Sequence, residues 1–182
     1  YIMSKNNKPK IIKDLRVGFS LLELLVYVAI VAAVTLFFSE VFISLNKGRG
    51  QVLAKNEVNS SLRFAFQKIM QDLKSASSVS VPAVAGATST SLTAQVSGSD
   101  VTYCVSSGIL RRQVVGVCDD SSPTITSDKV TVGTSTFSRL ENIKKVLGET
   151  FVSIEINLGI NYNSGSPDFQ YSESKKSTVG LR

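Results

Sequence analysis

Residues 18–38 read GFSLLELLVYVAIVAAVTLFF, and this stretch decides how the rest of the chain can fold. It joins a basic leader to about twenty nearly unbroken apolar residues. Twenty helical residues rising about 1.5 Å each span about 30 Å, the hydrocarbon thickness of a bilayer, so a membrane-spanning helix is predicted. Glu23 is the one carboxylate in the stretch, and a charge inside such a helix costs roughly 2.5–3.5 kcal/mol on insertion scales. Glu23 therefore requires a partner or a function.

The start of this stretch resembles the class III signal of type IV pilins and type II secretion pseudopilins. The match consists of a Lys- and Arg-rich leader, Gly18, the run Phe19-Ser20-Leu21-Leu22-Glu23, and then the apolar segment. In that family a membrane-embedded aspartyl prepilin peptidase cuts after the glycine and methylates the new amino terminus. The resemblance implies cleavage between Gly18 and Phe19, N-methylation of Phe19, and an assembly role for Glu23. Weaker patterns over residues 103–112 and 178–182 resemble minor pilins and J-type minor pseudopilins.

The assembly role of Glu23 has a physical reason. Cleavage after Gly18 places a new ammonium group at Phe19, within reach of Glu23 of a neighbouring subunit. A buried carboxylate without a partner is strongly destabilising, whereas a paired one is tolerable, so Glu23 can select correctly staggered neighbours.

Two other interpretations of the apolar stretch remain open. An ordinary single-span anchor explains the hydrophobicity but leaves Gly18 and Glu23 to chance. A cleaved secretory signal has a shorter apolar core and a small-residue site at its end. Val31-Ala32-Ala33 could serve as that site, although apolar residues continue to Phe38.

The positive charge of the chain is concentrated before the apolar stretch. The net charge is +6 over 182 residues, and residues 1–18 hold five basic side chains and one acid, so +2 remains after them. Positive residues that flank a span stay in the cytoplasm, so we expect the domain after the span to be exported. The resemblance implies that the membrane is the bacterial inner membrane, crossed once. Met3 is an alternative start of the chain. The charged residues of the leader are Lys5, Lys8, Lys10, Lys13, Asp14 and Arg16.

The composition argues against catalysis. The chain has no histidine, which removes Ser-His-Asp and Cys-His catalysis and the commonest metal ligand. Since no paired carboxylates or phosphate-binding loop are recognisable either, we expect neither an enzyme nor a cofactor. Asp119, Asp120 and Asp128 could bind calcium in principle, but they lack EF-hand spacing, and we expect no metal there.

Two cysteines, Cys104 and Cys118, lack the C-x-x-C spacing of a redox or zinc site. In an exported domain a disulfide is the natural state, and closing a loop of about 15 residues stabilises by roughly 3 kcal/mol. Two buried thiols are the alternative. In the predicted hairpin Cys104 falls near Leu110, well short of Cys118, so a bridge requires the second strand to bend, which Gly116 could allow.

An amphipathic helix is predicted over residues 46–76. Six apolar residues recur at three- and four-residue steps, the pattern of one buried stripe, while the charged residues, Asp72 among them, lie mainly off it. Gly48 and Gly50 each weaken a helix by about 1 kcal/mol, so residues 46–50 predict either a helix break or a flexible joint. The stripe consists of Val58, Leu62, Ala65, Phe66, Ile69 and Leu73.

The remaining residues, 77–182, predict a β-rich domain. Residues 101–105 and 109–117 form an expected hairpin, and residues 150–161 alternate in the clearest strand pattern of the chain. Two short strands are expected within residues 129–140, a polar connection over 141–148, and a partly strand-forming end. With a transmembrane helix over 19–45 and a stem helix over 46–76, this order gives an α+β class in a pilin-like arrangement, the long helix packing on an antiparallel sheet.

The leading functional expectation is a structural subunit, of minor type, of a type IV pilus or a type II secretion pseudopilus. Its expected partners are other pilin or pseudopilin subunits, prepilin peptidase and the membrane. One alternative is a competence-type subunit that grips DNA through a basic doublet, although such doublets are usually solvated surface and we do not expect nucleic acid. The other is a plain single-span anchor carrying an exported domain. The doublets are Arg111-Arg112, Lys144-Lys145 and Lys175-Lys176.

Overall fold

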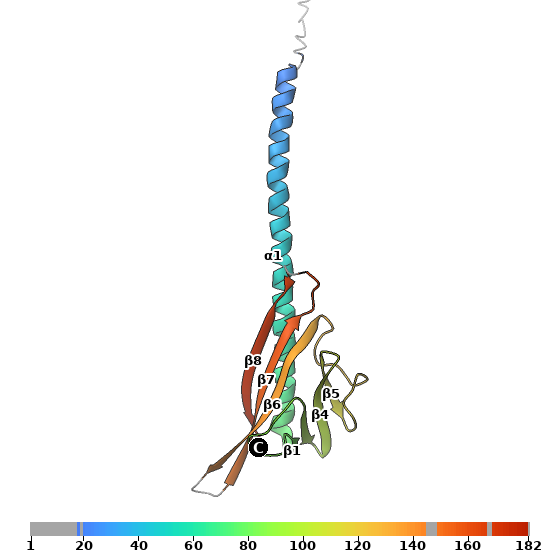
Figure 1. Cartoon of the computed structure of the whole chain (residues 1–182), viewed down its shortest axis with the longest axis vertical. Coiled ribbons are helices and arrows are strands. Elements are labelled where there is room, and N and C mark those ends of the chain that lie inside the picture. The colour runs from blue at the N-terminus through green and yellow to red at the C-terminus, as the bar shows by residue number, and fades with distance from the viewer. Residues whose placement is uncertain (1–17, 19, 145–148, 167–168, 182) are drawn as a thin grey trace, which may run out of the picture. The chain divides into compact units, whose positions relative to one another are not determined.

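The computed structural model describes residues 18, 20–144, 149–166 and 169–181 (Figure 1). The chain forms two compact units, Tyr1–Ser44 and Leu45–Arg182. The expected leader, apart from Gly18, lies outside the described residues, as does Phe19. We describe the two units separately. The first contains the apolar part of helix α1, and the second contains the rest of α1 and all the strands.

Helix α1 runs over Leu21–Ser75. Residues 46–50 are helical, so the expected helix break is wrong, while a flexible joint there stays a prediction. A packing contact accounts for Gly50, since a Cβ at this position would collide with Cε1 of the Phe169 ring. A Cβ at Gly48 would meet nothing within 4 Å. Gly50 is therefore the place where an aromatic ring approaches the helix backbone.

Two antiparallel four-stranded sheets follow the helix (Figure 1). Sheet A has the order β1-β3-β4-β5, with β1 at Ala76–Val81, β3 at Leu92–Val96, β4 at Ser99–Ser106 and β5 at Ile109–Val114. Sheet B has the order β2-β6-β7-β8, with β2 at Thr88–Ser89, β6 at Val130–Lys144, β7 at Glu149–Tyr162 and β8 at Ser172–Gly180. The amide of Val132 donates to the carbonyl of Gly108 at 2.7 Å and links the two sheets.

The predicted stripe of α1 forms the centre of the core. All six of its residues are buried, and they cluster with side chains of both sheets. Strand β7 alternates as predicted, with Ile154, Ile156 and Leu158 buried and residues between them more exposed. The α+β class, a long N-terminal helix packed on antiparallel sheets, is confirmed.

Strand β6 differs from the expectation. It is one strand of 15 residues in place of two short ones, and it extends through Lys144 into the segment expected to be a polar connection. A register shift between Val132 and Thr134 absorbs Gly133, so pairing with β7 continues on both sides of it.

The hairpin of β4 and β5 turns at Ser107 and Gly108, both with positive φ, as two-residue hairpin turns require. Strand β5 ends at Val114, three residues earlier than expected, because Val115 and Gly116 have φ values of 57° and 108° and leave the extended region.

Candidate functional site

The apolar part of α1 is the first candidate site. Every side chain from residue 21 to residue 44 is exposed, including Leu21 at 82% and Phe42 at 67%. By length and composition α1 could cross a membrane. A helix that is apolar on all sides and that no described residue of its own chain covers requires a lipid or protein environment. This segment is the part of the molecule that can anchor it or join it to other chains.

Glu23 lies in the first turn of α1, at the N-terminal end of this apolar segment. It makes no hydrogen bond or ion pair with any residue that the structure describes. A negative charge near a helix N-terminus is favoured by about 0.3–1 kcal/mol, which is less than the cost of placing it in a bilayer. Glu23 is thus available to a partner outside the chain. Gly18 has open space around it, and Phe19 lies outside the described residues.

A buried polar cluster holds the other end of α1 to sheet A. Asp72 is buried, with 5% of the residue exposed, and its Oδ2 accepts hydrogen bonds from the Tyr103 hydroxyl and from Nε of Arg112, each at 2.7 Å. Lys68, one turn earlier on the helix, places its Nζ 3.7 Å from Oδ1 of Asp72. The cluster therefore connects the helix to β4 and β5 at a single carboxylate.

The surroundings of Asp72 alter the titration of both partners. Burial, together with the hydrogen bond to Asp72 and its negative charge, raises the pKa of the Tyr103 hydroxyl far above its usual range. Burial opposes the charged form of Arg112, but the hydrogen bond and charge of Asp72 outweigh it and raise the pKa of the guanidinium. At neutral pH the Tyr103 phenol is therefore neutral and the Arg112 guanidinium is charged.

Asp72 was expected on the solvated side of the helix, and that expectation is wrong. A sequence signal for its burial existed, because steps of four, three, four and three residues lead from Val58 along the stripe to Asp72. The prediction placed Asp72 off the stripe because its side chain is charged, although its spacing fits the stripe. A carboxylate can occupy a stripe position when the opposite strands supply donors, and those donors come from residues 31 and 40 positions away.

A disulfide joins Cys104 and Cys118, with their Cα atoms 6.1 Å apart. Cys104 pairs in register with Arg111 on β5, so the chain must return to reach it. The return begins where β5 ends, at Val115 and Gly116. A disulfide fits a domain outside the reducing cytoplasm.

Two of the three basic doublets make contacts within the chain. Arg111 is only 9% exposed, donates through Nη1 to the carbonyl of Ser122 at 2.8 Å and pairs with Asp120. Together with Arg112, it is used in internal contacts, so this doublet is not the solvated pair that was expected. Lys176 pairs with Glu155 at 2.9 Å, and Lys175 lies 5.6 Å from the Phe66 ring. Of the third doublet, Lys145 lies outside the described residues.

The acidic loop forms internal turns. Oδ1 of Asp119 accepts from the backbone amide of Ser121 at 2.9 Å, and the Ser107 hydroxyl donates to Asp120 at 3.0 Å. Hydrogen bonds from Ser121 lower the pKa of Asp119, and those from Ser106 and Ser107 lower that of Asp120. Among the described residues, no group of three or more His, Cys, Asp or Glu side chains could hold a metal ion.

Comparison with known proteins yields no match among family models, curated proteins or solved structures. The architecture itself is pilin-like, because an N-terminal helix that begins as an exposed apolar segment goes on to pack on antiparallel sheets, and the domain that follows contains a disulfide.

Proposed function

We propose that this chain is a structural subunit, of minor type, of a type IV pilus or type II secretion pseudopilus. In this role it has no catalytic activity. Prepilin peptidase cuts it between Gly18 and Phe19, the methylated Phe19 becomes the first residue, and the chain joins other subunits through its N-terminal helix. The β-rich domain lies outside the cytoplasm, where its disulfide is stable.

One observation carries the proposal. A single helix, Leu21–Ser75, has two parts with different surroundings. The first is exposed and apolar, with a carboxylate in its first turn that has no partner among the described residues, and the second has one stripe buried in a β-sheet core. A plain membrane anchor needs the apolar part but no carboxylate in it, because the carboxylate raises the cost of insertion. A subunit that pairs Glu23 with the ammonium group of a neighbour accounts for both features.

The experiment begins with the mature N-terminus. The chain, expressed in a bacterium that has a prepilin peptidase, is recovered from membranes and from sheared filaments and its N-terminal peptide is identified by mass spectrometry. We expect a peptide that begins at methylated Phe19. An intact leader would leave the plain single-span anchor as the better description, and a cut after Ala33 would indicate a secretory signal.

The second part of the experiment tests the pairing of Glu23. Glu23→Ala and Glu23→Gln should be cleaved normally after Gly18 and should be missing from filaments, since both remove the charge that pairs with the ammonium group. Glu40→Ala is the matched control, because Glu40 is also an exposed carboxylate on α1 and lies beyond the longest apolar run. Normal entry of both Glu23 variants into filaments would contradict the assembly role.

A further inference from the structure

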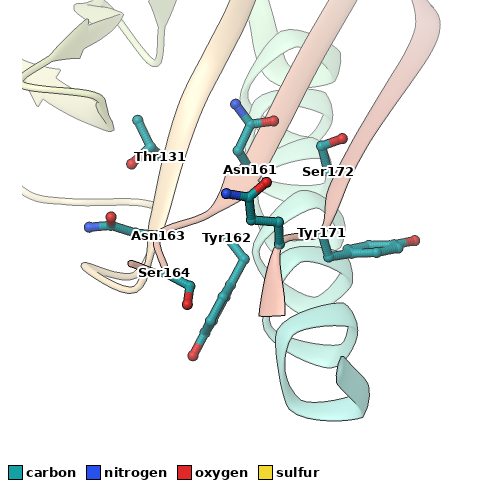
Figure 2. Close-up of a pocket in the computed structure, with 8 residues that line it drawn as sticks. Thr131, Asn161, Tyr162, Asn163, Ser164, Tyr171 and Ser172 are labelled. Atoms are coloured by element: carbon teal, nitrogen blue, oxygen red, sulfur yellow. The ribbon is translucent and has the colours of Figure 1, made fainter. Parts of the chain in front are cut away.

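A pocket whose described lining residues carry no charged side chain lies at one end of sheet B, between β6, β7, β8 and the described residues next to β7 and β8 (Figure 2). Its volume is about 580 Å³, within the roughly 300–1,000 Å³ of small-ligand sites. The described residues that line it carry hydroxyl, amide and phenol groups. It shares no residue with the apolar segment, with Glu23 or with the Asp72 cluster.

Three of these residues form a row across the sheet. Thr131 on β6 pairs with Asn161 on β7, and Asn161 pairs with Ser172 on β8. Residues in register on antiparallel strands point to the same face with Cβ atoms about 4.5–5.5 Å apart. All three are exposed, on the face opposite to the buried Ile160, and Figure 2 shows their side chains on three neighbouring strands. The row presents two hydroxyls and an amide to one ligand.

The backbone makes room for the amide of Asn161. A Cβ at Gly133 would lie 2.9 Å from Nδ2 of Asn161, closer than carbon and nitrogen can approach, so the amide occupies the space that a side chain would fill. Gly133 is also where the register of β6 shifts against β7. Bulges of this kind re-aim side chains next to functional sites.

The polar groups of the row are free of side-chain hydrogen bonds within the described part of the chain. Thr131, Asn161 and Ser172 make no side-chain hydrogen bond with another described residue, and the same holds for Asn163 and Gln170 at the rim. Hydroxyls and carboxamides can each donate and accept, so together they match a ligand with several groups that also do both. The half-buried Tyr171 adds an aromatic surface beside them.

We propose that this pocket binds a neutral saccharide. Vicinal sugar hydroxyls need donors and acceptors in close succession, which the row supplies. A phosphate or carboxylate ligand is favoured by an Arg guanidinium or a Lys ammonium, and no described lining residue has either group. The proposal goes beyond assembly of a filament and does not depend on it, because the site belongs to the domain and not to the apolar helix.

The test uses the full chain in a zwitterionic detergent, because sugar-headed detergents would compete. Neutral tetrasaccharides of glucose, galactose, mannose or N-acetylglucosamine are titrated at millimolar concentration, with a tetragalacturonate as the charged probe. Binding is measured by calorimetry and by the NMR shifts of side-chain amides. We expect at least one neutral tetrasaccharide to bind and to shift the Asn161 amide, and the charged probe to leave it unchanged.

The variants separate this pocket from the rest of the sheet. Loss of one or two hydrogen bonds in Asn161→Ala should weaken binding about tenfold, and the double variant with Ser172→Ala should abolish it. Asn157→Ala is the matched control, since Asn157 has the same residue type on the same face of β7 and pairs with Lys176, away from the pocket. Binding that is absent for every neutral probe, equal for the charged probe, or equally weakened by Asn157→Ala would overturn the proposal.

Discussion

Replacement of Asp72 tests how the stem of α1 is held to the sheets. In the unmutated protein the Tyr103 hydroxyl and Arg112 Nε both donate to Oδ2 of Asp72 at 2.7 Å. Asp72→Ala removes this common acceptor. Breaking a buried ion pair costs about 3–5 kcal/mol when the remaining charge stays uncompensated. The Arg112 side chain keeps 22% of its surface exposed and can recover some water, so we expect the lower end, about 3 kcal/mol.

Asp72→Asn separates charge from hydrogen bonding. The amide oxygen can still accept from Tyr103, but the attraction to Arg112 is lost, so we expect a smaller cost of about 1–2 kcal/mol. The pair with Lys68 contributes less, since its Nζ is 3.7 Å away on a side chain that is 32% exposed.

The assay is denaturant unfolding of the full chain in detergent, followed by circular dichroism of the β-rich domain. Glu57→Gln is the control, because it removes a carboxylate from the same helix without removing a contact that the structure shows. The reasoning is refuted if Asp72→Ala loses less than about 1 kcal/mol, the range of an exposed pair, or no more than Glu57→Gln.

Three further predictions concern stability under the same assay. Gly48→Ala should stabilise the helix by up to about 1 kcal/mol, whereas Gly50→Ala should not, because its Cβ collides with Phe169; equal gains would show that the ring moves away freely. Reduction of the disulfide should cost about 3 kcal/mol, as expected for the 14-residue separation of its cysteines, and an unchanged midpoint in reductant would contradict this. The raised pKa of Tyr103 means that the unfolded phenol ionises near pH 10 while the folded one keeps its proton, so stability should fall above pH 10 by up to about 1.4 kcal/mol per pH unit. Tyr103→Phe should remove that part of the alkaline loss, and identical pH profiles of the two proteins would argue against it.

Long, locally encoded features were predictable from the sequence. The apolar run, the buried stripe of α1 and the alternation of β7 each repeat over many residues with the period of one element, so neighbours in sequence carry the signal. The position of Glu23 was also evident from the sequence, because it is the one acidic residue in the apolar run of residues 18–38. The α+β class followed from the order of these elements.

The sheet order and the length of β6 required the tertiary structure. Gly133 looks like the end of a strand when β6 is read alone, but β7 continues to supply pairing partners on both sides of it. The same holds for residues 141–144, whose polar sequence resembles a connection until β7 lies beside them. Strand length depends on the partner's backbone, which no local pattern contains.

The sequence by itself determined where the chain is apolar, where its helix buries a stripe, and that a lone acid interrupts the apolar run. The tertiary structure decided the partners of polar groups: Asp72 with Tyr103 and Arg112, and the row of polar side chains across β6, β7 and β8. The physical reason is the separation in sequence between the residues that interact. Hydrophobic periodicity is written in neighbouring residues, whereas a buried charge is stable only when donors distant in sequence are brought to it by folding.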